Sequence, residues 1–572
     1  MLEKLSFVYG EDKARWILDE IIKKIEASAA KHQKQDSKSW VDEKDIILIT
    51  YGDQIREEGR TALSSLKDFV EEHLKGVIST IHILPFYPYS SDDGFSVIDY
   101  FKVNPELGNW EEIEGLALQF DLIFDAVINH ISVKSEWFAG YLKGKEEYRE
   151  FFIEADPRAD FSMVTRPRTL PLLTSFQGNE GEKHVWTTFS EDQIDINYKN
   201  GKVLLRIIDL LLFYLEKGAK AIRLDAIGYL WKESGTSCIH LEQTHKLIQL
   251  FRDIFETVSP DTRIITETNV PHKENISYFG NGFNEAHMVY QFPLPPLTLN
   301  AFHTGNARHL LEWADTLEAS SEKTTFLNFL ASHDGIGVMP AKGILSEEEV
   351  EAMVEKTREH GGYVSYKNNG DGTKSAYELN INYFDALSSP YEDEELKIKK
   401  FICSQGILLC LAGVPGIYAH SLLGSVNYRD GVLNTGINRS INREKLQRVE
   451  LEKELQNQEH RRSKVFGRYT GLIGKRRAEK AFHPNAGQKV VHGNEHVFSL
   501  LRTSRDGRDR VLCLNNVSNE SQTFSIDMSK LAAECRGLTD IITGKNHEVR
   551  ENTLKIELEP YDLMWLKIMV ND

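Results

Sequence analysis

Eight short apolar runs, most of them rich in β-branched residues, alternate with helical patterns along most of this chain of 572 residues. Such alternation is typical of parallel strands joined by helices, because each parallel pair needs a long crossover connection. The runs are Ile46–Tyr51, Thr80–Phe86, Leu122–Asn129, Ala221–Asp225, Arg263–Glu267, His287–Phe292, Thr325–Leu330 and Pro415–Ala419. Eight of them predict an α/β protein built on a (β/α)8 TIM barrel.

The connections and the chain ends predict additional domains. Two intervals are too long for simple connections, so we expect inserted loop domains that wall the pocket at the C-terminal ends of the strands. Helical spacing of apolar residues at 11–30 predicts an N-terminal helix, and alternating runs beyond residue 478 predict an antiparallel β domain. The predicted parts are an N-terminal helical extension (1–44), the barrel (45–127, 200–335 and 389–477), insertion domain B (128–199), an insertion after the seventh strand (336–388) and the C-terminal β domain (478–572).

The composition narrows the class of protein. A formal charge of −18 argues against a nucleic-acid or anionic-membrane surface, which would need clustered Lys and Arg. No stretch reaches the length of an apolar membrane span, and the N-terminus does not resemble a signal peptide. The five cysteines have no paired spacing, which favours free thiols in a reducing compartment. We therefore expect a cytoplasmic protein.

Three acidic residues stand at or just beyond the ends of apolar runs: Asp225, Glu267 and Asp334. A barrel aims such side chains into the pocket at its C-terminal mouth. Three carboxylates in one pocket suit glycosidic bond chemistry, in which one acts as nucleophile and another as acid/base. The alternative for each single residue is that it only caps the helix that follows, but three in this order favour the chemical role.

The neighbouring residues refine these roles. Arg223 lies two positions before Asp225, on the same face of a strand, and would favour the ionised state of a nucleophile. The same pair could be a structural ion pair. An apolar pocket around Glu267 would raise the pKa of this residue, which would allow it to act as a general acid. His130 and His333 could each donate a hydrogen bond to a sugar hydroxyl or simply be satisfied loop residues. The expected reaction is a retaining double displacement, with the second nucleophile left open as water, a sugar or phosphate.

The motifs Asp125-Ala-Val-Ile-Asn-His130, Arg223-Leu-Asp225, Glu267 and His333-Asp334 resemble the signature of the α-amylase superfamily, glycoside hydrolase family 13. Further motifs resemble its sucrose phosphorylase subfamily, in particular the glucosylglycerate and glucosylglycerol phosphorylases. They are Leu48-Ile-Thr-Tyr-Gly-Asp53, His82-Ile-Leu-Pro-Phe86, Ser91-Asp-Asp-Gly-Phe95, Arg166-Pro-Arg168, Gly235-Thr-Ser-Cys238, His333-Asp-Gly-Ile-Gly337 and Arg439-Ser-Ile-Asn-Arg443. The resemblance runs from about residue 45 to the end, so the N-terminal helix is an addition to the shorter sucrose phosphorylases.

The resemblance implies a cytoplasmic glycosyltransferase that carries out reversible phosphorolysis and releases α-D-glucose 1-phosphate. It implies a covalent glucosyl intermediate on Asp225, and it matches Asp92, Phe95, His130, Arg223, His333 and Arg439 to positions that hold the glucosyl unit. Arg168, Tyr377 and Gln193 match positions near the acceptor or phosphate. The expected partners are a small-molecule glucoside and phosphate, with no nucleic acid or membrane, and the protein is expected to be a monomer or homodimer. The resemblance implies no cofactor; inorganic phosphate takes part as a co-substrate.

No metal is expected either. Amylases often hold calcium near the position of Asn129, and sucrose phosphorylases do without it. Cys238 and His240 could in principle be metal ligands, but two candidates without further partners do not make a site.

The chain departs from sucrose phosphorylases on the acceptor side. Asn269 stands where sucrose phosphorylases carry His, and Glu378 stands where they carry Gln and sucrose 6-phosphate phosphorylases tend to carry His. These details resemble glucosylglycerate phosphorylases, with glucosylglycerol phosphorylase next. Glu378 fits neutral glycerol better than a glycerate carboxylate unless Arg168 or His272 compensates, and Val426-Asn-Tyr-Arg429 departs from the Arg-Asn-Asp pattern of glucosylglycerate enzymes. The acceptor is left open among glycerate, glycerol, fructose 6-phosphate and fructose. An amylase-type hydrolase and a catalytically silent sugar-binding subunit are the rival functions, and the presence of all three acids argues against the second.

Overall fold

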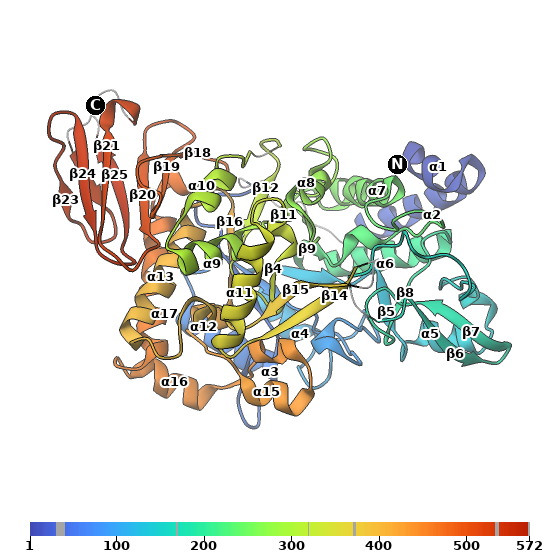
Figure 1. Cartoon of the computed structure of the whole chain (residues 1–572). Coiled ribbons are helices and arrows are strands. Elements are labelled where there is room, and N and C mark those ends of the chain that lie inside the picture. The colour runs from blue at the N-terminus through green and yellow to red at the C-terminus, as the bar shows by residue number, and fades with distance from the viewer. Residues whose placement is uncertain (30–39, 168–169, 319, 370–372, 532–536, 570–572) are drawn as a thin grey trace.

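Eight parallel strands close into a barrel in the computed structural model of the chain (Figure 1). The structure describes residues 1–29, 40–167, 170–318, 320–369, 373–531 and 537–569. In chain order the strands are β1 (Ile47–Thr50), β3 (Thr80–Ile83), β4 (Asp121–Ala126), β9 (Ala219–Leu224), β10 (Arg263–Thr266), β11 (Met288–Tyr290), β12 (Thr325–Asn328) and β16 (Val414–Tyr418). Each falls within or overlaps one of the eight predicted runs, which confirms the predicted fold class.

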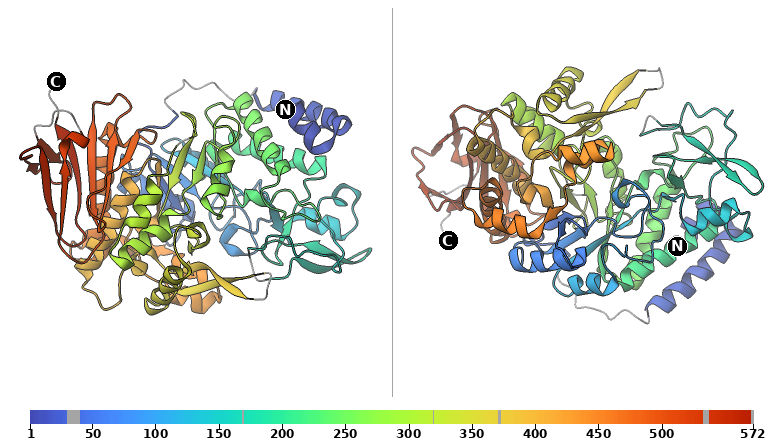
Figure 2. Two further views of the ribbon diagram at one scale, coloured as in Figure 1. Left: turned by 45° about the horizontal axis from the view of Figure 1, so that its top comes forward. Right: turned by 90° about the horizontal axis from the view of Figure 1, so that it is seen from below.

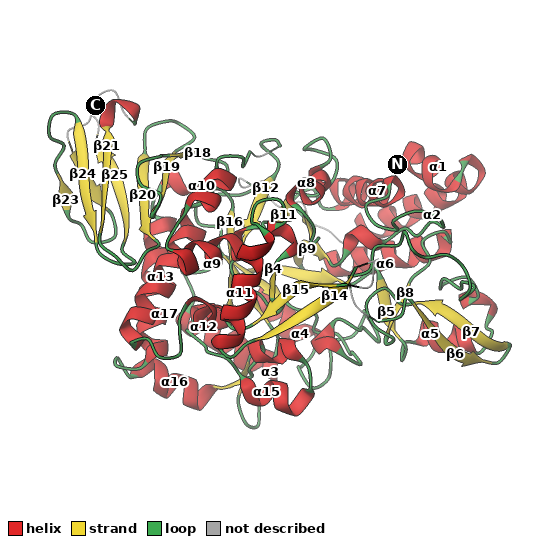
Figure 3. Cartoon of the chain, viewed as in Figure 1, coloured by secondary structure: helices red, strands yellow, loops and turns green. Residues whose placement is uncertain are grey.

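The register closes the barrel through its first strand. Ile47 lies opposite Thr80 on one side and opposite Gly416 on the other, so β1 joins β3 to β16. Nearly every strand residue is buried because helices cover the outer face of the sheet, as Figure 3 shows. The covering helices include α3 (Ala62–His73), α4 (Trp110–Ala117), α6 (Gly201–Glu216), α7 (Glu242–Val258), α9 (Leu294–Thr304), α10 (Arg308–Ala314), α13 (Glu394–Cys410) and α17 (Arg461–Arg477).

Two N-terminal helices pack against the outside of α6 and α7. Helix α2 (Glu11–Ala29) is the predicted one and buries Ile17 and Ile21, whereas α1 (Leu2–Tyr9) was not predicted. The N-terminal amine lies 3.1 Å from the carboxylate of Asp253 on α7, and Lys24 lies 2.6 Å from Asp209 on α6. Apolar burial and these ion pairs together dock the extension onto the barrel. The polar stretch Lys31–Ser39, which separates this helix from the first barrel run in the sequence, lies outside the described residues.

The segment that follows β4 forms a small β-rich unit beside the barrel (Figures 1 and 2). It contains β5 (His130–Ser132) paired with β8 (Gln193–Asp195), the hairpin β6 (Leu173–Gly178) and β7 (Gly181–Trp186), and helix α5 (Glu136–Leu142). His130 lies opposite Asp195 in the first pair, which brings both ends of this insertion back to the mouth of the barrel.

The segment after β12 forms a three-stranded sheet with two helices. Its strands are β13 (Ile336–Gly337), β15 (Lys374–Asn380) and β14 (Tyr363–Asn368), and its helices are α11 (Glu347–Glu359) and α12 (Tyr383–Leu387). Glu378 is paired with both Gly337 and Ser365, so it lies in the middle of this sheet. The register shifts between Ser365 and Tyr366, which leaves Tyr377 as the extra residue of a β-bulge.

The C-terminal part contains two antiparallel sheets with a core of their own. One sheet contains β18 (Gly487–Val490), β19 (Val497–Thr503), β20 (Arg510–Asn516), β25 (Leu563–Met569), β22 (Gly537–Asp540) and β23 (Asn546–His547), and the other pairs β21 (Gln522–Asp527) with β24 (Thr553–Leu558). Figure 1 shows these sheets at the end of the molecule opposite the N-terminal helices. The alternating runs that predicted this domain, Val497–Leu501, Arg510–Leu514, Gln522–Ile526 and Thr553–Leu558, are present as β19, β20, β21 and β24, whereas β18, β22, β23 and β25 were not predicted.

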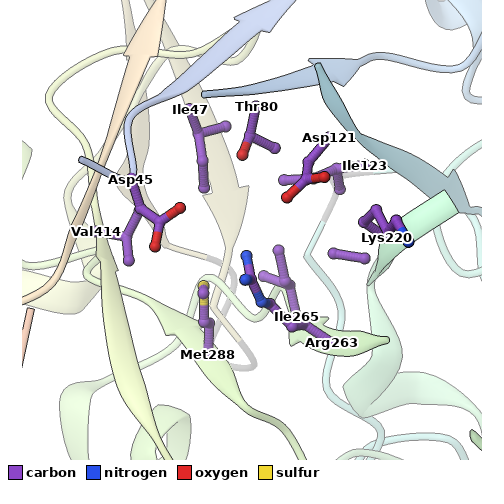
Figure 4. Close-up of a pocket in the computed structure, with 11 residues that line it drawn as sticks. Asp45, Ile47, Thr80, Asp121, Ile123, Lys220, Arg263, Ile265, Met288 and Val414 are labelled. Carbon is purple, nitrogen blue, oxygen red and sulfur yellow. The ribbon is translucent and has the colours of Figure 1, made fainter. Parts of the chain in front are cut away.

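The N-terminal ends of the barrel strands surround a small hollow (Figure 4). The side chains of Asp45, Asp121 and Arg263 point into it. Burial raises the pKa of Asp45, and the charge of Arg263 opposes that rise. Charged residues at this end of a barrel close its floor and contribute to stability rather than to catalysis.

Within the described residues, no helix is both long and apolar enough to cross a membrane.

Candidate active site

Asp225 follows directly after β9 and is bound by an arginine of the same strand. Arg223 donates from Nη1 to Asp225 Oδ1 at 2.9 Å and also to Asp125 on β4, and the guanidinium is almost fully buried. Asp125 Oδ2 in turn accepts from His82 Nε2 at 2.8 Å. Although burial opposes ionisation, Arg223 and His82 lower the pKa of Asp125 to about 2. Arg223 is therefore fixed between two carboxylates and cannot act as a mobile ligand.

Glu267 follows β10 and faces Asp225. Its Oε2 accepts a hydrogen bond from the backbone of Ala226 at 3.1 Å and lies 3.9 Å from Arg223 Nη2. Ala226 has a φ of 48°, a left-handed conformation that costs energy for a residue with a side chain and that turns its N–H toward Glu267. The strained turn therefore positions the carboxyl group of Glu267.

The two carboxyl groups share an environment that favours one proton between them. Burial raises the pKa of both Asp225 and Glu267. The charge of Glu267 further raises the pKa of Asp225, and the charge of Asp334 raises that of Glu267, while Arg223 opposes these effects. Arg223 touches Asp225 at 2.9 Å but lies 3.9 Å from Glu267, so the ionised form is favoured on Asp225. This arrangement can supply a nucleophile and a general acid at the same time.

Asp334 lies in the loop beyond β12, where it faces three basic side chains. Arg439 Nη1 is 2.5 Å from Asp334 Oδ1, His333 Nε2 is 3.6 Å away and Arg443 Nη2 is 3.8 Å away. His333 stacks on Phe95 with ring centroids 4.6 Å apart, and burial lowers its pKa well below the usual value. His333 is therefore neutral and available as a hydrogen-bond donor or acceptor beside Asp334.

His130 and Gln193 come from the insertion after β4 and meet above Phe95. Both His130 Nε2 and Gln193 Nε2 lie within hydrogen-bonding distance of the Phe95 carbonyl, at 2.9 and 3.0 Å. Their own nitrogens are 3.1 Å apart. Burial lowers the pKa of His130, so it too is neutral. The structure thus brings His130, Gln193, Phe95 and His333 to one side of the site.

The arginine that contacts Asp92 is Arg443, not the Arg439 of the same motif. Arg443 Nη1 lies 3.3 Å from Asp92 and 3.2 Å from Asp93, and its Nε donates to the His333 carbonyl at 2.9 Å. Asp92 and Asp93 both have positive φ, 52° and 48°, so this loop is held in a strained conformation. Sequence reasoning gave Arg443 no separate role, although it ends a motif that had been singled out.

The residues predicted near the acceptor lie in different surroundings. Asn269 lines a cavity of about 20 Å³ behind Asp334, with room for water but not for a sugar acceptor. Tyr377 is the bulged residue of β15. Glu378 is only 1% exposed and accepts from Arg439 Nε at 2.9 Å and Nη2 at 2.6 Å. Arg168 lies outside the described residues.

A lysine lies at Asn129, where amylases often hold calcium. Lys232 Nζ donates to Asn129 Oδ1 at 2.8 Å and pairs with Asp195 at 2.5 Å, and all three side chains are buried. Burial lowers the pKa of Lys232, while Asp195 opposes that shift. Both oxygens already have a cationic partner, so their geometry does not call for a metal. A second group of possible ligands in the described residues is Glu72, His73 and Glu452. Arg448 lies 2.8 Å from Glu72 and 3.7 Å from Glu452, so both carboxylates already have a cationic partner. Cys238 donates to the Glu233 carbonyl and His240 contacts Tyr278, so neither is directed toward a metal.

Comparisons with known proteins identify the family of the chain. The family described as alpha amylase, catalytic domain, matches residues 72–352, and maltogenic amylase, C-terminal domain, matches residues 489–565. The chain is 47% identical to glucosylglycerate phosphorylase of Spirochaeta thermophila over 99% of its own length and 98% of the relative's. It is 30% identical to sucrose phosphorylase of Agrobacterium vitis over 77% and 88% of the two chains. The chain belongs to the sucrose phosphorylase subfamily of the α-amylase superfamily.

The fold of this subfamily member is also found among solved structures. The structure of sucrose 6F-phosphate phosphorylase from Thermoanaerobacter thermosaccharolyticum has a TM-score of 0.73 and 24% sequence identity, and covers 93% of this chain and 99% of its own. The predicted family and the predicted barrel with a C-terminal β domain are therefore confirmed. The roles of individual residues in the present chain stay predictions.

Proposed function

We propose that the protein is a retaining glucosylglycerate phosphorylase, which converts glucosylglycerate and phosphate to glycerate and α-D-glucose 1-phosphate. The observation that carries the proposal is the 47% identity to glucosylglycerate phosphorylase of Spirochaeta thermophila over nearly the full length of both chains. The candidate site supports it, because a buried carboxylate pair can supply a nucleophile and an acid, with a third carboxylate alongside.

The first step transfers the glucosyl unit to the protein. Asp225 attacks the anomeric carbon and forms a covalent bond to it, while the bond from that carbon to the glycerate oxygen breaks. Glu267 gives its proton to the leaving oxygen. Asp334 stabilises the positive charge that develops on the ring in the transition state. The buried Arg223 lowers the basicity of Asp225 in the resting site and keeps its carboxylate in place.

The second step releases the product. A phosphate oxygen attacks the same carbon from the side the glycerate left, the bond to Asp225 breaks, and Glu267 takes the phosphate proton. Two inversions retain the α configuration. We assign Asp92, Phe95, His130, His333 and Arg443 to the glucosyl unit, with Arg439 acting on Asp334, and Arg168, Tyr377 and Gln193 to the acceptor side.

The environment of Glu378 removes one objection to an anionic acceptor. The sequence alone made a carboxylate at this position unfavourable for glycerate. In the structure, Glu378 is buried and accepts two hydrogen bonds from Arg439. The positive charge of Arg439 offsets that of the carboxylate, so the charge of Glu378 is not directed at the acceptor. The electrostatic argument for glycerol over glycerate therefore no longer applies.

Synthesis in the reverse direction tests the proposal. Phosphate release from α-D-glucose 1-phosphate would be measured with glycerate, glycerol, fructose and fructose 6-phosphate as acceptors. Glycerate should give the highest rate by at least about tenfold, which corresponds to about 1.4 kcal/mol of transition-state stabilisation. A preference for another acceptor would reject glucosylglycerate as substrate. Phosphate release that no acceptor changes would instead indicate an amylase-type hydrolase.

A further inference from the structure

Arg439 connects two carboxylates that come from different parts of the chain. Its Nη1 lies 2.5 Å from Asp334 Oδ1, and its Nε and Nη2 donate to the two oxygens of Glu378 at 2.9 and 2.6 Å. Glu378 Oε1 also accepts from the backbone N–H of Gly335, the residue after Asp334, at 3.0 Å. Glu378 therefore binds both the arginine that touches Asp334 and the backbone beside Asp334.

This geometry fixes the guanidinium in one orientation. A bidentate pair between a guanidinium and a carboxylate restricts rotation of the planar fork, and Glu378 is itself fixed in the middle strand of its sheet. The remaining nitrogen, Nη1, then points at Asp334. Among the described residues, it makes the shortest contact of any basic group to the Asp334 carboxylate, since His333 and Arg443 lie at 3.6 and 3.8 Å.

The pairing also preserves charge where the reaction needs it. Asp334 and Arg439 alone would sum to zero, and the carboxylate would lose much of its effect on a developing positive charge. With Glu378 included, the three groups carry a net charge of −1, so Asp334 keeps its negative charge beside the reacting carbon. The cost of burying these charges is offset by the hydrogen bonds that each of them makes.

We propose that Glu378 is a positioning residue: it acts on Asp334 through Arg439 and does not contact the acceptor. The inference rests on the role of Asp334 in the proposed function. It also gives the insertion after the seventh strand a role in catalysis, because β15 supplies Glu378.

The first test is Glu378→Gln, assayed with glucosylglycerate, with several acceptors in reverse synthesis and with α-glucosyl fluoride as an activated donor. Loss of a hydrogen bond to a charged group predicts a fall in kcat/KM of roughly 10- to 100-fold. The fall should be similar for every acceptor and for the fluoride, with the acceptor KM nearly unchanged. A loss confined to the acceptor KM, with normal use of the fluoride, would overturn the proposal and assign Glu378 to the acceptor site.

The pH profile gives a readout that a purely structural role would not change. The charged and polar groups facing Glu267 are Arg223 on β9, Asp225 and the Ala226 N–H after it, Asp334 after β12, and Arg439 in the 3-10 helix Asn438–Asn442. Glu378→Gln removes the negative charge that is paired with Arg439, one member of this set, so the positive charge of Arg439 is less compensated and lowers the pKa of Glu267. The basic limb of the kcat/KM profile should therefore move to lower pH by about half a unit. An unshifted limb would contradict the electrostatic part of the proposal.

A double-mutant cycle tests whether Glu378 acts through Arg439. In an Arg439→Gln background, Glu378→Gln should cause no further loss of kcat/KM, because the connection to Asp334 is already broken. Losses that multiply would show independent roles and overturn the inference. If Glu378→Gln fails to fold, as judged by circular dichroism, Arg439→Lys serves instead, since it keeps the charge but loses the fork. It should show the same uniform loss across acceptors.

The outcome can be separated from that of the proposed function. The wild-type acceptor survey decides whether glycerate is the acceptor, whereas the uniform loss with α-glucosyl fluoride depends only on Asp334 and the glucosyl unit. Another preferred acceptor would reject glucosylglycerate as substrate and still leave Glu378 testable.

Discussion

Arg223 Nη1 lies 2.9 Å from Asp225 Oδ1 and holds this carboxylate at the end of β9. If Asp225 forms the covalent bond to glucose, Asp225→Asn should lower turnover by at least about 10⁴-fold, because an amide is not a competent nucleophile here. The amide oxygen can still accept from Arg223, so circular dichroism and thermal unfolding should remain close to wild type. Near-normal turnover by the variant would reject Asp225 as nucleophile.

Glu267→Gln should affect poor leaving groups most. Burial and the charge of Asp334 raise the pKa of Glu267, which favours a protonated general acid. A glycerate oxygen needs that proton when it leaves, whereas fluoride does not, so kcat/KM for glucosylglycerate should fall by about 10²- to 10⁴-fold and glucosylation by α-glucosyl fluoride far less. An equal loss for both donors would argue against the acid role.

The barrel was predictable because its strands are short, apolar and separated by clear helical patterns. The C-terminal part was only partly predictable. Strands β21 and β24 alternate between buried and exposed residues, and their period of two is visible in the sequence. In β25, Trp565 and Leu566 are consecutive and both buried, because Trp565 belongs to the large core that includes the barrel and Leu566 to the core between the C-terminal sheets, so no alternation reveals this strand. Helix α1 is too short for a periodic signal, and its position depends on a contact with Asp253 far along the chain.

The candidate site, like the fold, could be predicted only in part from the sequence. Asp225 and Glu267 were recognisable because each directly follows an apolar strand, and Asp334 because it belongs to a motif. The partners of Glu378 could not be read from the sequence, because Arg439 is 61 residues away and the side chains meet only through tertiary packing. The same limit applies to Lys232, whose contact with Asn129 spans 103 residues. Long-range pairs between charged residues carry no local pattern.

Lys232→Met should destabilise the protein by about 3–5 kcal/mol, because Asp195 would be left buried without its cation. Lys199→Met is a matched control, since its ion pair with Glu233 is about half exposed and should contribute at most about 1 kcal/mol. Urea unfolding of both variants measures the difference. A chelator should leave the Tm of the wild-type protein unchanged, because the Lys232 amine already satisfies Asn129 and Asp195. Equal effects of the two substitutions would contradict the structural role of Lys232.

His420 should make the protein less stable in mild acid. Burial, helped by the charges of Arg462 and Lys445, lowers the pKa of His420 from 6.5 to about 3, and its ring nitrogens contact Gln54 and Ser425. Below pH 6.5 the unfolded chain binds a proton that the folded protein does not, so stability is complete above that pH and declines as the pH falls toward about 3. The loss attributable to this histidine is about 1.4 kcal/mol per pH unit. Urea unfolding at several pH values between 8 and 5 should therefore show a shallower decline for His420→Gln than for the wild type. Parallel declines would mean that His420 takes up its proton in the folded protein, and that its burial does not control the acid response.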